Sequence, residues 1–291
     1  MPLPRLPGVL LAVSTAKFLA VPFGDLRRRL DQSLIYDWAM RCPIIVYCCF
    51  ILFRDVHAFY LQVLQEPVLF AQFDGGVIVA MLARISQWMF VVLLSIQPLF
   101  RLRAIGKSAD LLPRLAALAA VGVPLMFLLL ERAPASLPYN VTAVIVSLFA
   151  NVMLLVTVSF LGRSLSVMPE ARRLVEDGPY GMVRHPLYLF EMLAIIAVAL
   201  QYRSLPAAAL LALAIVLQVA RARWEEGVLA RAFPDFAAYR ARTSFIIPSD
   251  PVRFLASFMI DPSVRRRSAL VVACMVAVLG LAAAALPRLI V

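Results

Sequence analysis

The chain has 291 residues, of which 63% are hydrophobic and only 15% are charged. Soluble domains average roughly 45–50% apolar and about 25% charged residues, so this composition, with a mean hydropathy of +0.89, excludes an ordinary soluble domain and indicates a membrane protein. The formal net charge of +11 is compatible with either a nucleic acid or a membrane surface as partner.

Apolar stretches that approach or exceed the length of a membrane span recur along the chain. A helical span needs roughly 20 apolar residues. Seven stretches fit a span: Leu34–Phe53, Val77–Phe100, Leu111–Leu130, Val141–Gly162, Leu187–Gln201, Pro206–Ala220 and Ser268–Leu286. An eighth, Gly8–Phe23, is short and contains Lys17, so it is either a tilted span or an interfacial segment; no cleavage site marks it as a signal peptide. The predicted fold is all-α, a polytopic membrane protein with about seven or eight transmembrane helices.

Basic residues gather on one side of this predicted topology. If Arg27–Arg29 lie in the cytoplasm, the seven spans place the remaining basic clusters on that same side. The opposite loops, Arg54–Gly76 and Glu131–Asn140, contain few arginines and several acids. This is the positive-inside pattern. Membrane topology and anionic headgroups therefore account for the charge, and no nucleic acid partner is expected.

Cysteine and histidine usage gives no indication of a metal site. The four cysteines all fall in apolar runs, without a CxxC pair: Cys42, Cys48, Cys49 and Cys274. His57 and His185 are the only histidines. We therefore expect no bound metal.

The segment Gly178–Tyr188 is polar although hydrophobic runs flank it on both sides. It contains Arg184 and His185, and a cation at a membrane edge needs a partner because little water is available there. Structural arginines are common at membrane ends. The segment is therefore either a structural anchor or part of a binding site.

A predicted helical hairpin brings a second polar cluster to the same membrane face. Leu187–Gln201 and Pro206–Ala220 are joined by a short turn, and a proline suits the first turn of the second helix. The hairpin returns the chain to Arg221–Glu226, close to the first cluster. The two clusters then form either a closed salt-bridge network or a site.

The side chains of the two clusters suit one ligand in particular. They include aromatic rings, cationic donors and paired carboxylates, without a nucleophile beside a base or a glycine-rich phosphate loop. Aromatic faces attract a sulfonium or ammonium group, arginine or histidine binds a carboxylate, and glutamate binds ribose hydroxyls or an amine. S-adenosylmethionine carries all of these groups and is therefore a candidate cofactor.

Aromatic residues recur at helical spacing after the second cluster: Leu229, Phe233, Phe236 and Tyr239. Arginines lie between them. The pattern predicts an interfacial helix with its rings at the headgroup boundary, and the same helix could serve as a lid over the site.

The ordered motifs resemble the superfamily of isoprenylcysteine carboxyl methyltransferases and phospholipid methyltransferases. Its members show Gly-x-Tyr, then Arg-His-Pro-x-Tyr, a helical hairpin, an arginine-rich stretch ending in Glu-Glu, and a tail to Ile-Pro. The matching positions are Gly178, Tyr180, Arg184-His185-Pro186-Leu187-Tyr188, Arg221, Arg223, Glu225-Glu226, Phe233, Tyr239 and Ile247-Pro248. The resemblance covers about residues 160–248.

The resemblance implies S-adenosylmethionine bound at the cytoplasmic face, beneath a membrane cavity that admits a lipidic acceptor. Cofactor binding is then expected of Gly178, Tyr180, Arg184, His185, Pro186, Tyr188 and Glu226. Catalytic roles are expected of Arg223, Glu225 and Arg221, and either Arg223 or Arg221 would orient the acceptor or the cofactor carboxylate. Glu191 lies outside the family pattern, and a catalytic role is expected of it because an amine acceptor would need its proton removed.

Three features depart from the family pattern. Phe190 followed by Glu191 stands where relatives often have glycine, and a glutamate inside a membrane helix must be paired or functional. Either it pairs with Arg184 or Arg223, or it faces the acceptor and favours an amine. Pro234-Asp235-Phe236 also differs from relatives, and the span Ser268–Leu286 lies beyond the shared region.

These inferences divide the chain into three parts: N-terminal membrane helices over 1–160, a methyltransferase core over 161–250, and a linker with an extra span over 251–291. The predicted function is S-adenosylmethionine-dependent methylation of a hydrophobic carboxylate, amine or thiol acceptor, in a bacterial inner membrane. The alternatives are an NADPH-dependent sterol or enone reductase, whose C-terminal architecture is related, and a non-enzymatic scaffold. Neither the acceptor nor the oligomeric state follows from the sequence.

Overall fold

The computed structural model describes residues 34–65, 75–100, 102, 104–107, 111–131, 137–166 and 168–290. The predicted segment Gly8–Phe23 lies outside these residues. The chain divides into two compact units, Met1–Tyr47 and Cys48–Val291. Every contact of the site described below lies within the second unit.

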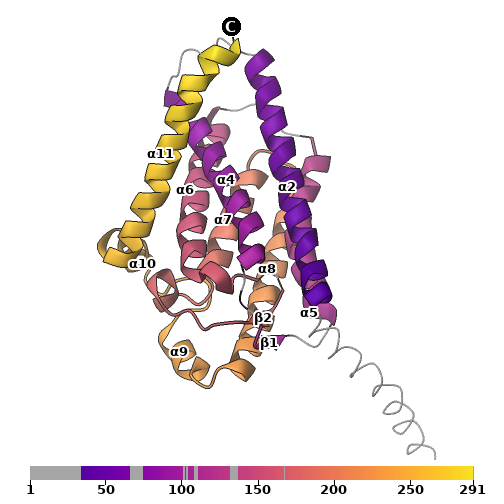
Figure 1. The fold of residues 1–291 in the computed structure, drawn as a ribbon, viewed down its shortest axis with the longest axis vertical. Helices are drawn as coiled ribbons and strands as arrows, with labels where there is room; N and C mark the ends of the chain where they lie inside the picture. Colours follow the sequence, from indigo (N-terminus) through magenta and orange to yellow (C-terminus); the bar gives the residue numbers. More distant parts are fainter. Residues whose placement is uncertain are drawn as a thin grey trace, which may run out of the picture. The chain divides into compact units, whose positions relative to one another are not determined.

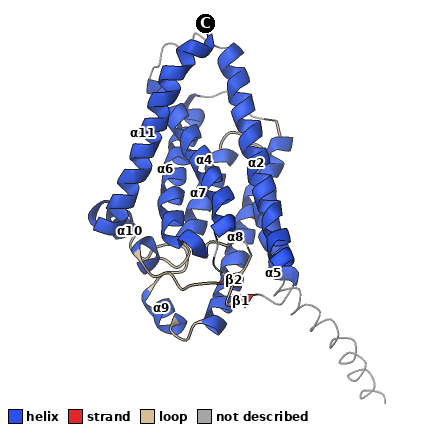
Figure 2. Cartoon of the chain, viewed as in Figure 1, coloured by secondary structure: helices blue, strands red, loops and turns tan. Residues whose placement is uncertain are grey.

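The described residues are mostly helical (Figure 1, Figure 2). The α-helices are α2 (Leu34–Gln65), α4 (Gly75–Phe100), α5 (Leu111–Gly122), α6 (Leu137–Leu161), α7 (Pro186–Ala199), α8 (Leu205–Ala232), α9 (Phe236–Arg242), α10 (Pro251–Ile260) and α11 (Pro262–Ile290). Short 3-10 turns are η1 (Val123–Leu129), η2 (Gly162–Ser164) and η3 (Gly178–Gly181). The predicted helical class is therefore confirmed.

Three helical segments among the described residues are long and apolar enough to cross a membrane: Ile45–Gln65, Tyr139–Ser164 and Leu205–Ala232. Four shorter apolar helices are Val77–Leu93, Leu112–Phe127, Pro186–Ala199 and Pro251–Ile260. The protein is thus a helical membrane protein, and the total of seven or eight spans stays a prediction.

Two short strands tie the α4–α5 connection to the segment before the Arg-His-Pro motif. Strand β1 (Gly106–Lys107) pairs antiparallel with β2 (Glu170–Ala171), with Gly106 opposite Ala171. A side chain at Gly106 would meet Ala232 and Ala171 at 3.4 and 3.6 Å, so glycine allows this close approach to α8. The pairing holds β2 against α8, near the end that carries the second polar cluster.

The predicted hairpin of α7 and α8 is confirmed, but its second helix is longer than expected. Ser204 caps α8 by accepting a hydrogen bond from the Ala207 backbone, and the helix continues for 28 residues. Arginine, glutamate and alanine are good helix formers, so the helix does not end at Ala220. The second polar cluster consequently lies on a rigid helix rather than after its end.

The expected interfacial helix is interrupted. Pro234 cannot continue α8, so the chain turns between Ala232 and Phe236, where α9 begins. Phe236 and Tyr239 are buried in the protein rather than exposed at a headgroup boundary. The prediction of one continuous interfacial helix is wrong.

A cluster of aromatic and aliphatic side chains packs α6 and α7 against the C-terminal helices. Phe190 of α7 stacks on Phe254 of α10 with ring centroids 6.1 Å apart, and Phe258 meets the same ring edge-on. The expected linker after residue 250 thus contains a helix, capped by Asp250. Burial of these rings holds α7 in place just after Tyr188, the last residue of the Arg-His-Pro-x-Tyr motif.

Candidate functional site

The loop before α7 owes its shape to one glycine. Gly178 has φ +58°, a conformation that L-residues with side chains rarely adopt, and a Cβ there would lie 2.5 Å from the Phe160 ring. The turn that follows buries Tyr180, whose hydroxyl finds no partner among the described residues. The predicted role of Gly178 in shaping the pocket wall therefore has a physical basis.

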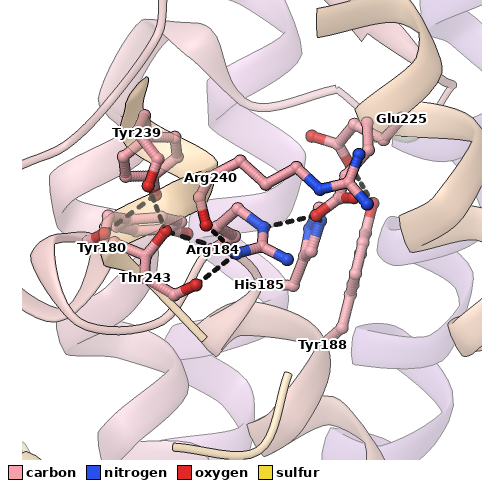
Figure 3. A network of polar contacts seen from close by, with 9 residues as sticks. Tyr180, Arg184, His185, Tyr188, Glu225, Tyr239, Arg240 and Thr243 are labelled. Atoms are coloured by element: carbon pink, nitrogen blue, oxygen red, sulfur yellow. Dashed lines mark hydrogen bonds and ion pairs between the residues drawn. The ribbon is translucent and has the colours of Figure 1, made fainter. Parts of the chain in front are cut away.

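The tail after α9 folds back onto this loop. Arg184 and His185 donate their backbone N–H groups to the carbonyls of Ser244 and Phe245, at 2.8 and 3.1 Å. Tyr239 adds a hydrogen bond of 2.8 Å from its hydroxyl to the Tyr180 carbonyl (Figure 3). Two segments about 60 residues apart in sequence thereby form one wall.

Arg184 links three parts of this wall. Its Nε donates to Glu226 Oε1 at 2.5 Å, and its Nη1 donates to the carbonyls of Arg240, at 3.1 Å, and Thr243 (Figure 3). Both side chains of the Arg184–Glu226 pair are largely buried. A planar guanidinium can serve several acceptors at once, so Arg184 acts as the structural centre of the loop, α8 and the tail.

His185 lies between aromatic rings at the start of α7. It stacks on Tyr188 at 5.4 Å, with an angle of 10° between the ring planes, and meets Phe245 edge-on at 5.3 Å. Pro186 begins the helix, where a missing N–H costs nothing. The His185 Nε2 atom is buried, lies 3.5 Å from Glu226 Oε1 and makes no hydrogen bond.

Helices α7 and α8 meet through Tyr188 and two residues one turn apart on α8. The Tyr188 hydroxyl donates to Glu225 Oε2 at 2.5 Å, and the Arg221 guanidinium lies 4.7 Å above the Tyr188 ring. Arg221 also donates to the Ser166 carbonyl at 3.3 Å. The two predicted clusters are thus in direct contact.

Glu191 pairs with Arg221, not with Arg184 or Arg223 as expected. The Arg221 Nη1 atom lies 3.8 Å from Glu191 Oε2, and Gln218 donates to the same oxygen at 2.8 Å. The reason is the antiparallel hairpin, which sets Gln218 and Arg221 of α8 opposite this turn of α7.

Arg223 does not join the cluster. Two residues of an α-helix are separated by about 200° around its axis, so Arg223 lies on nearly the opposite side of α8 from Arg221. It is exposed and has no hydrogen bond or ion pair with the part of the chain that the structure describes. Of the two arginines, only Arg221 lies at the site.

A pocket with about 390 Å³ of empty space, part of it open to solvent, adjoins these residues. It is lined by Leu161, Ser164, Leu165, Ser166, Glu170, Tyr180, Arg184, His185, Leu187, Tyr188 and Glu225. Five of its lining residues were predicted to belong to the site.

Sequence reasoning missed the part of the pocket that precedes the motif. Glu170 of β2 accepts hydrogen bonds from Arg172 at 2.5 Å and from Ser166 at 3.0 Å. The acid lies within the polar stretch before Gly178, but its place beside the pocket depends on the pairing of β1 and β2. Spacing alone does not show that pairing.

Burial also changes the acidity of two tyrosines in the wall. It raises the pKa of Tyr180 well above its ordinary value, with the negative charge of Glu225 as the next contribution. Burial and then the charge of Glu176 raise the pKa of Tyr239 in the same way. Both hydroxyls are therefore neutral at physiological pH. Tyr239 donates its proton to the Tyr180 carbonyl, whereas the Tyr180 hydroxyl has no partner among the described residues.

A comparison with known protein families matches the part of the chain that contains helices α7 and α8. The phospholipid methyltransferase family matches residues 138–235, from the first turn of α6 to just past the end of α8. This confirms the predicted resemblance to the superfamily of integral-membrane methyltransferases. The matched family is one of methyltransferases, which makes methyl transfer the reaction to propose, and nothing in the match points to a reductase.

Two curated relatives are similar over a shorter stretch. The cobalt-zinc-cadmium resistance protein CzcN of Cupriavidus metallidurans is 38% identical over 107 residues, which cover 33% of this chain and 50% of the relative. The nickel-cobalt-cadmium resistance protein NccN of Alcaligenes xylosoxydans xylosoxydans is 38% identical over 101 residues, covering 33% and 47%. The chain spans about half the length of the relatives it matches.

Proposed function

We propose that the protein is an integral-membrane methyltransferase that transfers a methyl group from S-adenosylmethionine to a hydrophobic acceptor. One observation carries the proposal: the contacts of Tyr188 with Glu225 and of Arg184 with Glu226 join both motif clusters beside a single pocket. The family match over residues 138–235 supplies the reaction class.

The residues around the pocket fit the cofactor. The Tyr180 hydroxyl and the His185 Nε2 atom are buried without a hydrogen-bond partner among the described residues, and such orphaned groups commonly await a ligand. His185 offers a donor to a carboxylate, while Glu225 offers acceptors to ribose hydroxyls or an amine. Tyr180 and Tyr188 both line the pocket, and aromatic rings attract a sulfonium.

The chemistry requires alignment more than acid–base assistance. The bound cofactor supplies a methyl carbon already activated by positive sulfur. Tyr188 lines the pocket and Arg221 packs over its ring, and we infer that these two residues orient the acceptor and exclude water. Correct alignment of two reactants accelerates a transfer by orders of magnitude.

The proposed arrangement in the membrane follows from the charge pattern. The basic clusters put the site at the cytoplasmic face, in a bacterial inner membrane, with about seven or eight helices across the bilayer. The core of activity is residues 161–250, which hold the motif loop, the hairpin and the tail. The acceptor reaches this core from the lipid side.

Incubation of purified protein with methyl-labelled S-adenosylmethionine and a lipid extract tests the proposal. We expect label in a lipid-soluble product, and loss of that label in His185→Ala and Glu226→Ala variants that still insert in the membrane. The alternative of a non-enzymatic scaffold predicts a different result. Neither the wild type nor the His185→Ala/Glu226→Ala double variant would then give a labelled product, and the double variant would behave as wild type in cells.

A further inference from the structure

The α7–α8 hairpin contains a second polar group deeper than the pocket. Glu191 and Arg221 lie about one helical turn beyond the Tyr188–Glu225 contact, and Gln218 lies about one turn further, toward the apolar middle of α8. A helical turn advances about 5.4 Å. This group therefore lies on the side from which a lipidic acceptor approaches.

Two atoms of this group lack a partner among the described residues. Gln218 is 3% exposed and Arg221 is 4% exposed, yet Gln218 Oε1 and Arg221 Nε make no hydrogen bond. The amide orientation is fixed, because Gln218 must present its N–H to the Glu191 carboxylate. The group thus contains one buried acceptor and one buried donor that no described residue engages, and a polar ligand atom would satisfy either.

Among the described residues, the charged side chains that contact this group leave no unpaired cation for an anionic acceptor. Two arginines, Arg184 and Arg221, face three glutamates, Glu191, Glu225 and Glu226. S-adenosylmethionine carries one net positive charge and would balance the remaining carboxylate. Arg221, the cation nearest the acceptor side, is already engaged by Glu191 at 3.8 Å.

We propose that Glu191 determines acceptor specificity: it neutralises Arg221, so the site rejects a carboxylate and accepts an uncharged polar group. This inference rests on the proposed function. An uncharged acceptor atom donates its lone pair to the methyl carbon while the electron pair of the broken C–S bond stays on sulfur. The acceptor then loses a proton, which Glu191 receives and passes to water. A carboxylate acceptor would lose no proton and would need Arg221 for itself.

The test compares the product class of wild type and Glu191→Gln. Each protein is incubated with methyl-labelled S-adenosylmethionine and one lipid extract, and the labelled lipids are treated with base. Methyl esters release volatile methanol under base, whereas N-, O- and S-methyl groups bound to carbon chains do not. We expect base-stable label from wild type, and at least a tenfold rise in the base-labile fraction in Glu191→Gln.

Two further variants separate specificity from folding. Glu191→Asp keeps the charge and should keep the wild-type product class at a lower rate. Glu131→Gln removes an exposed glutamate outside the site and should change nothing. Base-labile label as the main product of wild type, or an unchanged ratio in a Glu191→Gln protein that binds S-adenosylhomocysteine, overturns the proposal. Absence of S-adenosylhomocysteine binding by wild type contradicts the proposed function instead.

Discussion

The Tyr188 hydroxyl donates a hydrogen bond of 2.5 Å to Glu225, and this contact joins the two helices of the hairpin at the pocket. Tyr188 belongs to the Arg-His-Pro motif and Glu225 to the paired glutamates, which are 37 residues apart. Both residues line the pocket. A carboxylate there suits the ribose hydroxyls or the amine of the proposed cofactor.

Removal of that hydroxyl should weaken cofactor binding. In Tyr188→Phe, Glu225 loses a donor worth about 1.5–3 kcal/mol, so the affinity for S-adenosylhomocysteine should fall roughly ten- to a hundredfold in calorimetry. Tyr202→Phe is the matched control, since Tyr202 is buried at the other end of the hairpin with Phe127. Equal affinity of both variants would contradict the role of the contact.

The two arginines of α8 should differ in their effect on methyl transfer. Arg221 contacts Tyr188, Glu191 and Ser166, so Arg221→Ala should lower the initial rate by roughly a hundredfold or more. Arg223 is exposed, and Arg223→Ala should stay within about threefold of wild type. The measurement is transfer of labelled methyl to lipid. A larger loss from Arg223→Ala would show that the assignment is wrong.

Arg184, whose ion pair is largely buried, should contribute more to stability than Arg242, whose ion pair lies at the surface. Loss of one partner of a buried ion pair costs about 3–5 kcal/mol, so Arg184→Ala should lower the unfolding temperature in detergent clearly. Arg184→Lys should retain only part of the stability that Arg184→Ala loses, because an ammonium group cannot donate to Glu226 and the tail carbonyls together. Arg242 pairs with Glu176 at the exposed surface, and Arg242→Ala should cost about 1 kcal/mol or less.

Replacement of Gly178 and of Gly227 by alanine should change the stability of the fold in opposite directions. Gly178→Ala forces a side chain into a left-handed conformation and onto the Phe160 ring, which should destabilise the protein by roughly 1–3 kcal/mol from the backbone alone. Gly227 lies within α8, and a Cβ there meets nothing closer than 3.9 Å. Gly227→Ala should therefore stabilise by about 0.5–1 kcal/mol. Thermal unfolding of both variants gives the comparison.

Stability should fall in strongly alkaline solution because of Tyr239. Burial and the charge of Glu176 raise the pKa of Tyr239 in the folded protein above its unfolded value, which is about 10. The stability that the neutral Tyr239 side chain contributes to the fold is then complete below about pH 10, and it is lost as the pH rises toward the pKa of Tyr239 in the folded protein. Unfolding temperatures from pH 8 to 11 should fall less steeply in Tyr239→Phe. Parallel curves for both proteins would contradict this expectation.

The sequence was sufficient to predict the helical class, the hairpin and the meeting of the two polar clusters. Hydrophobic length and motif order are local properties, so Tyr188 and Glu225 could be placed on one face. The partner of Glu191 could not be predicted, because it depends on how α7 and α8 are rotated against each other. The same rotation decides that Arg221, rather than Arg223, faces α7. Glu170 was missed because a non-local strand pair brings it to the pocket.

Calorimetric titration of S-adenosylhomocysteine into the purified protein tests the central claim most directly. The contacts around His185 and Glu226 predict saturable binding to wild type, no saturable binding to His185→Ala or Glu226→Ala, and none of NADPH to any of the three proteins. Absence of binding to correctly inserted wild-type protein, or equal binding to all three proteins, would contradict it.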